Sequence, residues 1–157
     1  MSPPDRCVLC LVHPADGELR AVSSALSDVQ AGGGSLILAT VHDPAEEEAL
    51  GLRLSDASFV GLKLTEEVER LAARHAVDQL QEHLARAERL ALEANIPVET
   101  RAETGPLCET LQRLVAMLSP AQAHLPRLPQ GFKDRILRGN ATDLLRRALS
   151  CPTKIVE

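Results

Sequence analysis

Short apolar runs alternate along this chain with longer stretches in which apolar residues recur at helical spacing. Residues 7–12 are almost continuously apolar, which is typical of a strand covered on both faces. The stretch 19–29 has helical spacing, and the glycines at 32–34 separate it from a second apolar run at 36–41. Strand, helix and strand in this order predict a βαβ unit with parallel strands.

The same alternation continues to the carboxyl terminus. The polar stretch 42–64 has no clear period and is interpreted as a long loop. The later segments predict helices over 65–95, 106–118 and 140–149, and strands over 96–100, 121–125 and 153–156. We therefore predict an α/β fold: one domain over residues 1–157, with a doubly wound parallel sheet of five strands and helices on both faces.

Composition excludes several classes of partner. At 157 residues the chain can bury a core without disulfides or metals. Its formal net charge is -5, and Phe59 and Phe132 are its only aromatic residues, so we expect no binding to nucleic acid. No apolar run is long enough to cross a membrane, and the amino terminus has no secretory pattern. These features predict a cytoplasmic protein without a membrane partner.

Cys7 and Cys10 have the spacing of a redox or zinc half-motif. They lie in a predicted strand, where residues three positions apart point to opposite faces. No second pair with this spacing follows. We interpret them as buried structural thiols.

The order and register of these segments resemble the universal stress protein family over nearly the whole chain. The resemblance rests on the first two predicted strands, on residues 104–107 before the third helix, and on the terminal segment 136–156 with Ser150-Cys151-Pro152. It implies strand order 3-2-1-4-5, with a ligand at the carboxyl ends of the strands. It also implies a homodimer formed through the terminal strand, residues 152–157.

The ATP-binding members of that family carry the motif G-x2-G-x9-G-S/T. Counting back from Gly139 places Pro129 and Pro126 at the two upstream glycines, and Asn140 at the last position. Proline has a fixed φ and no N–H, so it cannot donate to a phosphate as glycine can. His13 also stands where ATP-binding members have an acidic residue.

The resemblance and these departures together predict a dimeric binding or regulatory module in the stress response. We expect it to hold no cofactor and not to bind ATP tightly. The alternative is a member that binds ATP with Mg²⁺, or another nucleotide, with a weak ATPase or signalling role.

For a nucleotide or anion pocket, the candidate residues are those that the resemblance and the charge pattern place near the strand ends: His13, Val41, Gly105, Gly139, Asn140, Arg127 and Arg138. The two arginines belong to the one concentrated basic stretch of the chain. Such a stretch can attract a phosphate, or it can be an ordinary solvated loop.

Three histidines give a second hypothesis for a site. His13, His42 and His124 each lie at or near the end of a predicted strand, where their imidazoles could bind a divalent metal together with Asp43. The sequence shows no Ser/His/Asp arrangement, carboxylate pair or phosphate-binding loop that would indicate catalysis. We therefore expect a protein that is not an enzyme.

Overall fold

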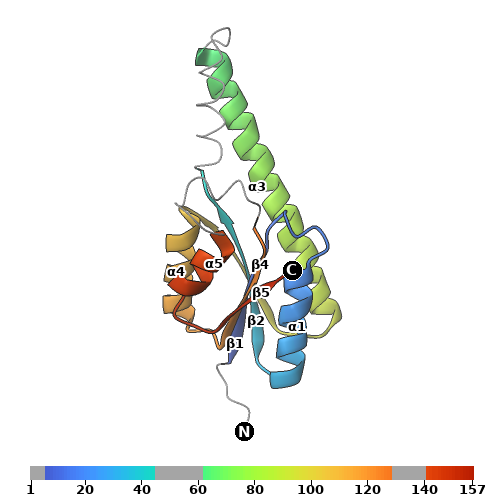
Figure 1. The fold of residues 1–157 in the computed structure, drawn as a ribbon. Helices are drawn as coiled ribbons and strands as arrows, with labels where there is room; N and C mark the ends of the chain where they lie inside the picture. The colour runs from blue at the N-terminus through green and yellow to red at the C-terminus, as the bar shows by residue number, and fades with distance from the viewer. Residues whose placement is uncertain (1–5, 45–61, 129–140) are drawn as a thin grey trace.

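A computed structural model describes residues 6–44, 62–128 and 141–157. Five parallel strands form one sheet in the order β3-β2-β1-β4-β5 (Figure 1). The strands are β1 (Cys7–Leu11), β2 (Ser35–His42), β3 (Val98–Thr104), β4 (Gln122–Pro126) and β5 (Thr153–Val156). The predicted fold class and strand order are confirmed.

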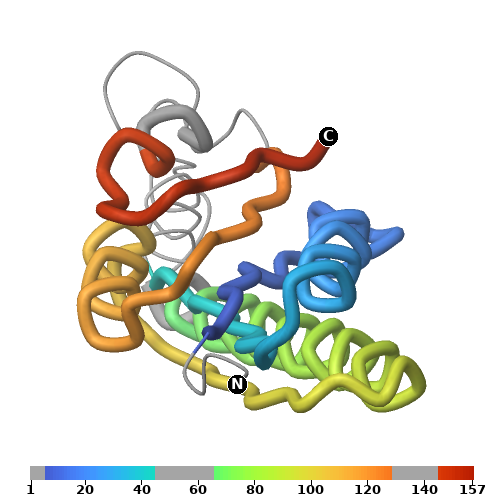
Figure 2. The backbone as a smooth tube through the Cα atoms, turned by 90° about the horizontal axis from the view of Figure 1, so that it is seen from below, coloured from blue at the N-terminus to red at the C-terminus, as the bar shows by residue number. Residues whose placement is uncertain are grey.

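Helices cover both faces of the sheet. They are α1 (Arg20–Gly32), α3 (Leu62–Glu93), α4 (Leu107–Leu118) and α5 (Ala141–Ala148). Helices α1 and α3 lie on one face, and α4 and α5 lie on the other (Figures 1 and 2). The sheet is thus the middle layer of three, and each face has its own apolar core.

Strand β1 contributes to both cores because its side chains alternate between the two faces. Cys7, Leu9 and Leu11 pack in the core beneath α4 and α5. Val8 and Cys10 pack in the core beneath α1 and α3. The two cysteines therefore lie on opposite faces as predicted, and burial raises the pKa of both thiols above the ordinary range.

Two predicted boundaries were wrong. Strand β3 begins at Val98 and runs to Thr104, whereas the sequence suggested 96–100. It is an edge strand without a fully buried residue, so its polar composition conceals the strand pattern. Helix α3 begins at Leu62, three residues before the predicted Thr65. Most of the predicted loop, residues 45–61, lies outside the described residues.

Helix α3 ends as the sequence predicts. Asn95 has a left-handed backbone, with φ of 57°, just beyond the helix. The opposite half of α3 extends past the carboxyl ends of the strands (Figure 1). Despite its 32 residues α3 is amphipathic, and no helix within the described residues is both long and apolar enough to cross a membrane.

Candidate functional site

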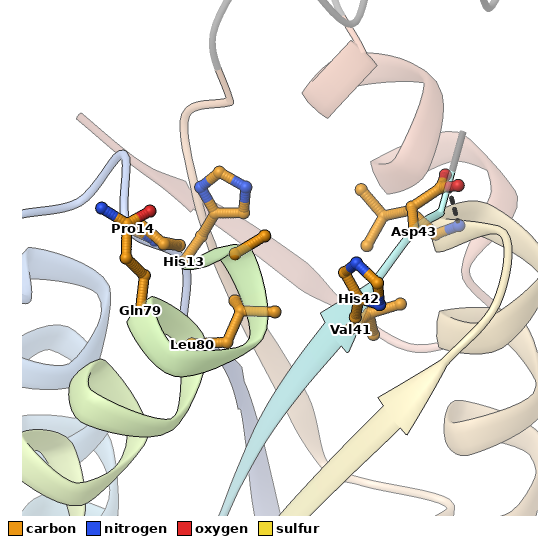
Figure 3. A pocket seen from close by; sticks show the side chains of 9 residues that line it. His13, Pro14, Val41, His42, Asp43, Gln79 and Leu80 are labelled. Atoms are coloured by element: carbon orange, nitrogen blue, oxygen red, sulfur yellow. Dashed lines mark hydrogen bonds between the residues drawn. The ribbon is translucent and has the colours of Figure 1, made fainter. Parts of the chain in front are cut away.

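A pocket of about 130 Å³ opens where β1 and β2 end (Figure 3). Strand order reverses beside β1, at the point where doubly wound sheets bind their ligands. The lining residues come from the ends of the two strands and from the helices α3 and α4 above them: His13, Pro14, Val41, His42, Asp43, Ala76, Gln79, Leu80 and Leu107. The pocket therefore includes two of the residues predicted for a nucleotide or anion site, His13 and Val41.

His13 follows β1 and is held by the loop after it. The backbone N–H of Ala15 donates to His13 Nδ1 at 3.0 Å, which assigns the ring proton of the neutral imidazole to Nε2. Burial lowers the pKa of His13 to about 4, and His83 adds to this effect while Asp16 opposes it. At neutral pH the ring is uncharged, so it can neither pair with a phosphate as a cation nor hold Mg²⁺ as a carboxylate does.

At this edge of the sheet, carboxylates of the protein accept hydrogen bonds from backbone N–H groups at the amino-terminal ends of α1 and α4. Both oxygens of Asp16 accept backbone hydrogen bonds at the start of α1, each at 2.9 Å, from Arg20 and Ala21. Asp43 Oδ2 accepts from the Leu107 N–H at the start of α4, at 3.4 Å. Helix amino termini are common phosphate sites, and here an incoming anion would compete with a carboxylate at each of them.

The pocket lining that the described residues form contains no cationic side chain for a polyphosphate such as ATP. Among these lining residues Asp43 is the one acidic side chain, and no arginine or lysine is present. Pro126, the last residue of β4, has no N–H to offer a phosphate. The chemistry of this lining suits a small uncharged ring better than a polyphosphate.

Of the other predicted pocket residues, the structure describes Gly105 and Arg127, and neither lines the pocket. Gly105 lies beside the pocket, where its N–H donates to the His42 carbonyl at 2.9 Å. Its φ of 148° favours glycine. Arg127 lies in another hollow, next to the carboxyl terminus, and forms an ion pair with Glu157. Arg138, Gly139 and Asn140 lie outside the described residues.

The three-histidine metal hypothesis is wrong in its geometry. His13 and His42 line one pocket, but His124 lies in a separate groove beside α1. His124 pairs with Cys10, so it lies within the sheet rather than at its carboxyl edge. Within the described ranges, no three His, Cys, Asp or Glu side chains are close enough together to hold a metal ion.

His124 instead belongs to a Ser/His/Asp arrangement that the sequence analysis missed. Ser24 Oγ lies 3.0 Å from His124 Nδ1, and Asp28 Oδ2 lies 3.1 Å from His124 Nε2. The expectation that no such arrangement exists was therefore wrong. Ser24 and Asp28 are four residues apart on α1, which is the one sequence signal that they share a helix face.

The pocket residues that α3 contributes were not predicted from the sequence either. Ala76, Gln79 and Leu80 cover the pocket, although the sequence pattern only placed them on a long amphipathic helix. Their helical spacing shows that they share a face, but it does not show which strand ends they cover.

Comparison with protein-family models gave no match, and comparison with curated proteins gave none either. Among solved structures, a universal stress protein from Archaeoglobus fulgidus matches 98% of this chain and 95% of its own, at 9% identity and TM-score 0.64. A universal stress protein in complex with cAMP matches 98% of both chains, at 19% identity and TM-score 0.61. Another from Archaeoglobus fulgidus, in complex with dAMP, matches 100% of both chains at 12% identity and TM-score 0.56. The chain thus has the universal stress protein fold.

Proposed function

We propose that this chain is a universal stress protein that acts as a binding or regulatory module in the stress response. Its pocket takes a nucleoside or a similar small ring compound, and it does not bind ATP tightly. The observation that carries the proposal is the lining of the pocket by mainly apolar side chains, the neutral ring of His13 and one carboxylate.

The size of the pocket supports a small ligand. At about 130 Å³ it is smaller than the roughly 300–1,000 Å³ typical of sites that enclose a whole drug-sized molecule. Val41, Leu80 and Leu107 offer apolar contact, while His42 and Gln79 offer polar groups. Solved neighbours bind cAMP and dAMP, which supports adenine nucleosides as the first ligands to test.

Calorimetric titration of the purified protein with adenosine, cAMP and ATP tests this function. We expect one adenosine per chain, and ATP weaker by at least about tenfold because its phosphates meet Asp43 and no cation from the described lining. Asp43→Asn should reduce the difference in binding affinity between ATP and adenosine. Micromolar ATP binding to the natural sequence would overturn the proposal and favour a nucleotide-binding protein with an ATPase or signalling role.

A matched pair of variants locates the binding. Ala76 lines the pocket from α3, so Ala76→Leu should fill part of the cavity and abolish adenosine binding. Ala85 is exposed on the same helix, and Ala85→Leu should leave binding unchanged. Equal adenosine affinity in the two variants would place the ligand elsewhere.

We further propose a homodimer formed through residues 152–157. Strand β5 is at the edge of the sheet and pairs with β4 on one side, and an edge strand is a template for pairing with another chain.

A cytoplasmic location belongs to the same proposal. It is supported by the free thiols of Cys7, Cys10, Cys108 and Cys151, which suit a reducing compartment.

A further inference from the structure

We propose that Ser24 is a nucleophilic serine, activated by His124, in a groove between α1 and the β4–β5 edge of the sheet. The substrate class is a small ester, and the reaction is acyl transfer to Ser24. This groove is separate from the pocket of the proposed function, so each can fail without the other.

The hydrogen bonds form a continuous relay. Ser24 Oγ is 3.0 Å from His124 Nδ1, and His124 Nε2 is 3.1 Å from Asp28 Oδ2. Because an ionised carboxylate only accepts, it fixes the proton of the neutral ring on Nε2 and leaves Nδ1 to accept from the hydroxyl. This is the polarity required of a general base that activates an alcohol.

Arg6 binds Asp28, the last residue of this hydrogen-bond relay. Its guanidinium donates to Asp28 Oδ1 at 2.7 Å and to the Gly33 carbonyl at 2.6 Å. Burial alone would raise the pKa of Asp28, but the hydrogen bonds from His124 and Arg6 lower it overall. Asp28 is therefore a positioning residue that remains an anion beside the imidazole.

His124 is poised as a neutral base. Its ring is 2% exposed, and this burial lowers its pKa below the ordinary value. The charged groups around it are Asp28 on α1, which raises the pKa, and Lys154 on β5, which lowers it, while β1 contributes the buried thiol of Cys10. The neutral ring can accept a second proton at neutral pH because its Nδ1 carries none.

Ser24 is accessible from a groove of about 610 Å³. The groove is within the volume range of small-molecule sites. Gln122 and Lys154 line it together with Ser24, and an amide and an ammonium are the groups that stabilise a developing oxyanion. The groove thus brings a nucleophile, a base and hydrogen-bond donors together on one surface.

Ser24, His124, the ester and water account for every bond and proton in the chemical step. The Ser24 oxygen attacks the ester carbonyl carbon as its proton passes to His124 Nδ1, giving a tetrahedral intermediate. The bond from carbon to the leaving alkoxide then breaks, and the alkoxide takes the proton from His124. The products are an acyl-Ser24 ester and a free alcohol, and water releases the acyl group by the same route.

A fluorophosphonate probe tests the nucleophile directly. In this reaction the serine oxygen displaces fluoride from phosphorus and the proton passes to His124. We expect one adduct per chain, mapped to Ser24 by peptide mass spectrometry, and a burst of p-nitrophenol from p-nitrophenyl acetate. Ser24→Ala should abolish both, and His124→Gln should slow labelling at least about tenfold.

Two neighbouring serines supply matched controls. Ser23 and Ser27 are exposed in the same groove, and it is Ser24 that forms the hydrogen bond to His124, so Ser23→Ala and Ser27→Ala should label at the natural rate. Circular dichroism confirms that each variant is folded. Absence of an adduct on the natural protein, labelling at Ser23 or Ser27, or undiminished labelling of folded His124→Gln would each overturn the proposal.

The pH profile distinguishes activation from a merely structural hydrogen bond. The labelling rate should be constant at neutral pH and fall in acid, below the ordinary pKa range of histidine, because protonated His124 cannot accept from Ser24. Asp28→Asn removes a group that raises the pKa of His124, so the fall should move to lower pH. A rate that rises steadily with pH in both proteins would contradict a role for His124.

Discussion

Two histidines of this protein are kept neutral by burial. His13 lies beside the pocket at the end of β1, and His124 lies inside the sheet against α1. Burial lowers the pKa of both rings, and His124 has the carboxylate of Asp28 as a direct partner. Their protonation in acid therefore opposes the folded state.

Replacing His13 with glutamine should reduce the acid sensitivity of the protein. The pKa of His13 is about 4 when folded, below the ordinary 6.5, so between these values the unfolded chain binds a proton that the folded chain does not. The contribution of neutral His13 to the free energy of unfolding is present above pH 6.5. It is lost as the pH falls toward 4, at up to about 1.4 kcal/mol per pH unit. Urea unfolding at pH 7.5 and pH 5 measures the difference.

The control for this experiment is His75→Gln, because His75 is exposed on α3. At pH 5, the natural protein and His75→Gln should lose about 1–2 kcal/mol more than His13→Gln, relative to pH 7.5. The same loss in all three proteins would mean that His13 is not buried in solution.

At the residue scale, the sequence placed some groups correctly and others not. His13 follows a continuous apolar run, so its position at a strand end could be predicted. The contacts of His124 could not, because they depend on the pairing of β4 with β1 and on the docking of α1 across the sheet. Spacing along the chain contains no information about two segments that meet only after folding.

At the scale of elements, β5 is arranged to accept a further strand. The Pro152 carbonyl accepts from Ala123 N–H, and the Val156 carbonyl accepts from Arg127 N–H, so these two residues face β4. Backbone groups alternate in direction along a strand, which points the N–H and carbonyl of Thr153 and Ile155 away from β4. The proposed dimer would use these outward groups.

Ile155→Pro should therefore convert the dimer into a monomer while keeping β5 paired with β4. Proline removes an outward N–H, and edge strands tolerate it where that N–H is not used within the sheet. Ile155→Ala is the control, since it shortens the same side chain but keeps the N–H. Native mass spectrometry measures the mass of each. A monomeric natural protein, or a dimeric Ile155→Pro, would rule out pairing through this edge.

The burial of each strand shows why β1 and β2 were easier to predict than β3. The central strands β1 and β2 are buried along their length and read as apolar runs. Strand β3 is half-covered, and Glu99, Arg101 and Glu103 interrupt its apolar pattern. Sequence patterns report burial, so the limits of β3, which buries little, were predicted wrongly.

At the scale of the whole molecule, two apolar cores share one strand. Helices α1 and α3 close one core and helices α4 and α5 close the other, and β1 packs into both. If either layer separates, a face of β1 loses its cover. We therefore expect the two layers to unfold together in one cooperative transition.

Cys7 and Cys10 are natural reporters of the two layers. Each is buried in a different core, and burial raises the pKa of both thiols, so neither should react with a thiol reagent while its layer is folded. Brief alkylation along a urea series, with each cysteine followed by peptide mass spectrometry, should give one midpoint for both. Earlier labelling of Cys7 would show that the α4–α5 layer opens by itself.

A substitution in one core tests the coupling more strictly. Leu38 is fully buried beside Cys10, and Leu38→Ala should cost about 2–5 kcal/mol of unfolding free energy. If β1 joins the layers, the midpoints of Cys7 and Cys10 should fall by the same amount, although Cys7 lies on the opposite face of the sheet. A shift confined to Cys10 would mean that the sheet separates two independently stable layers. An equal shift would mean that the two layers unfold as one cooperative unit.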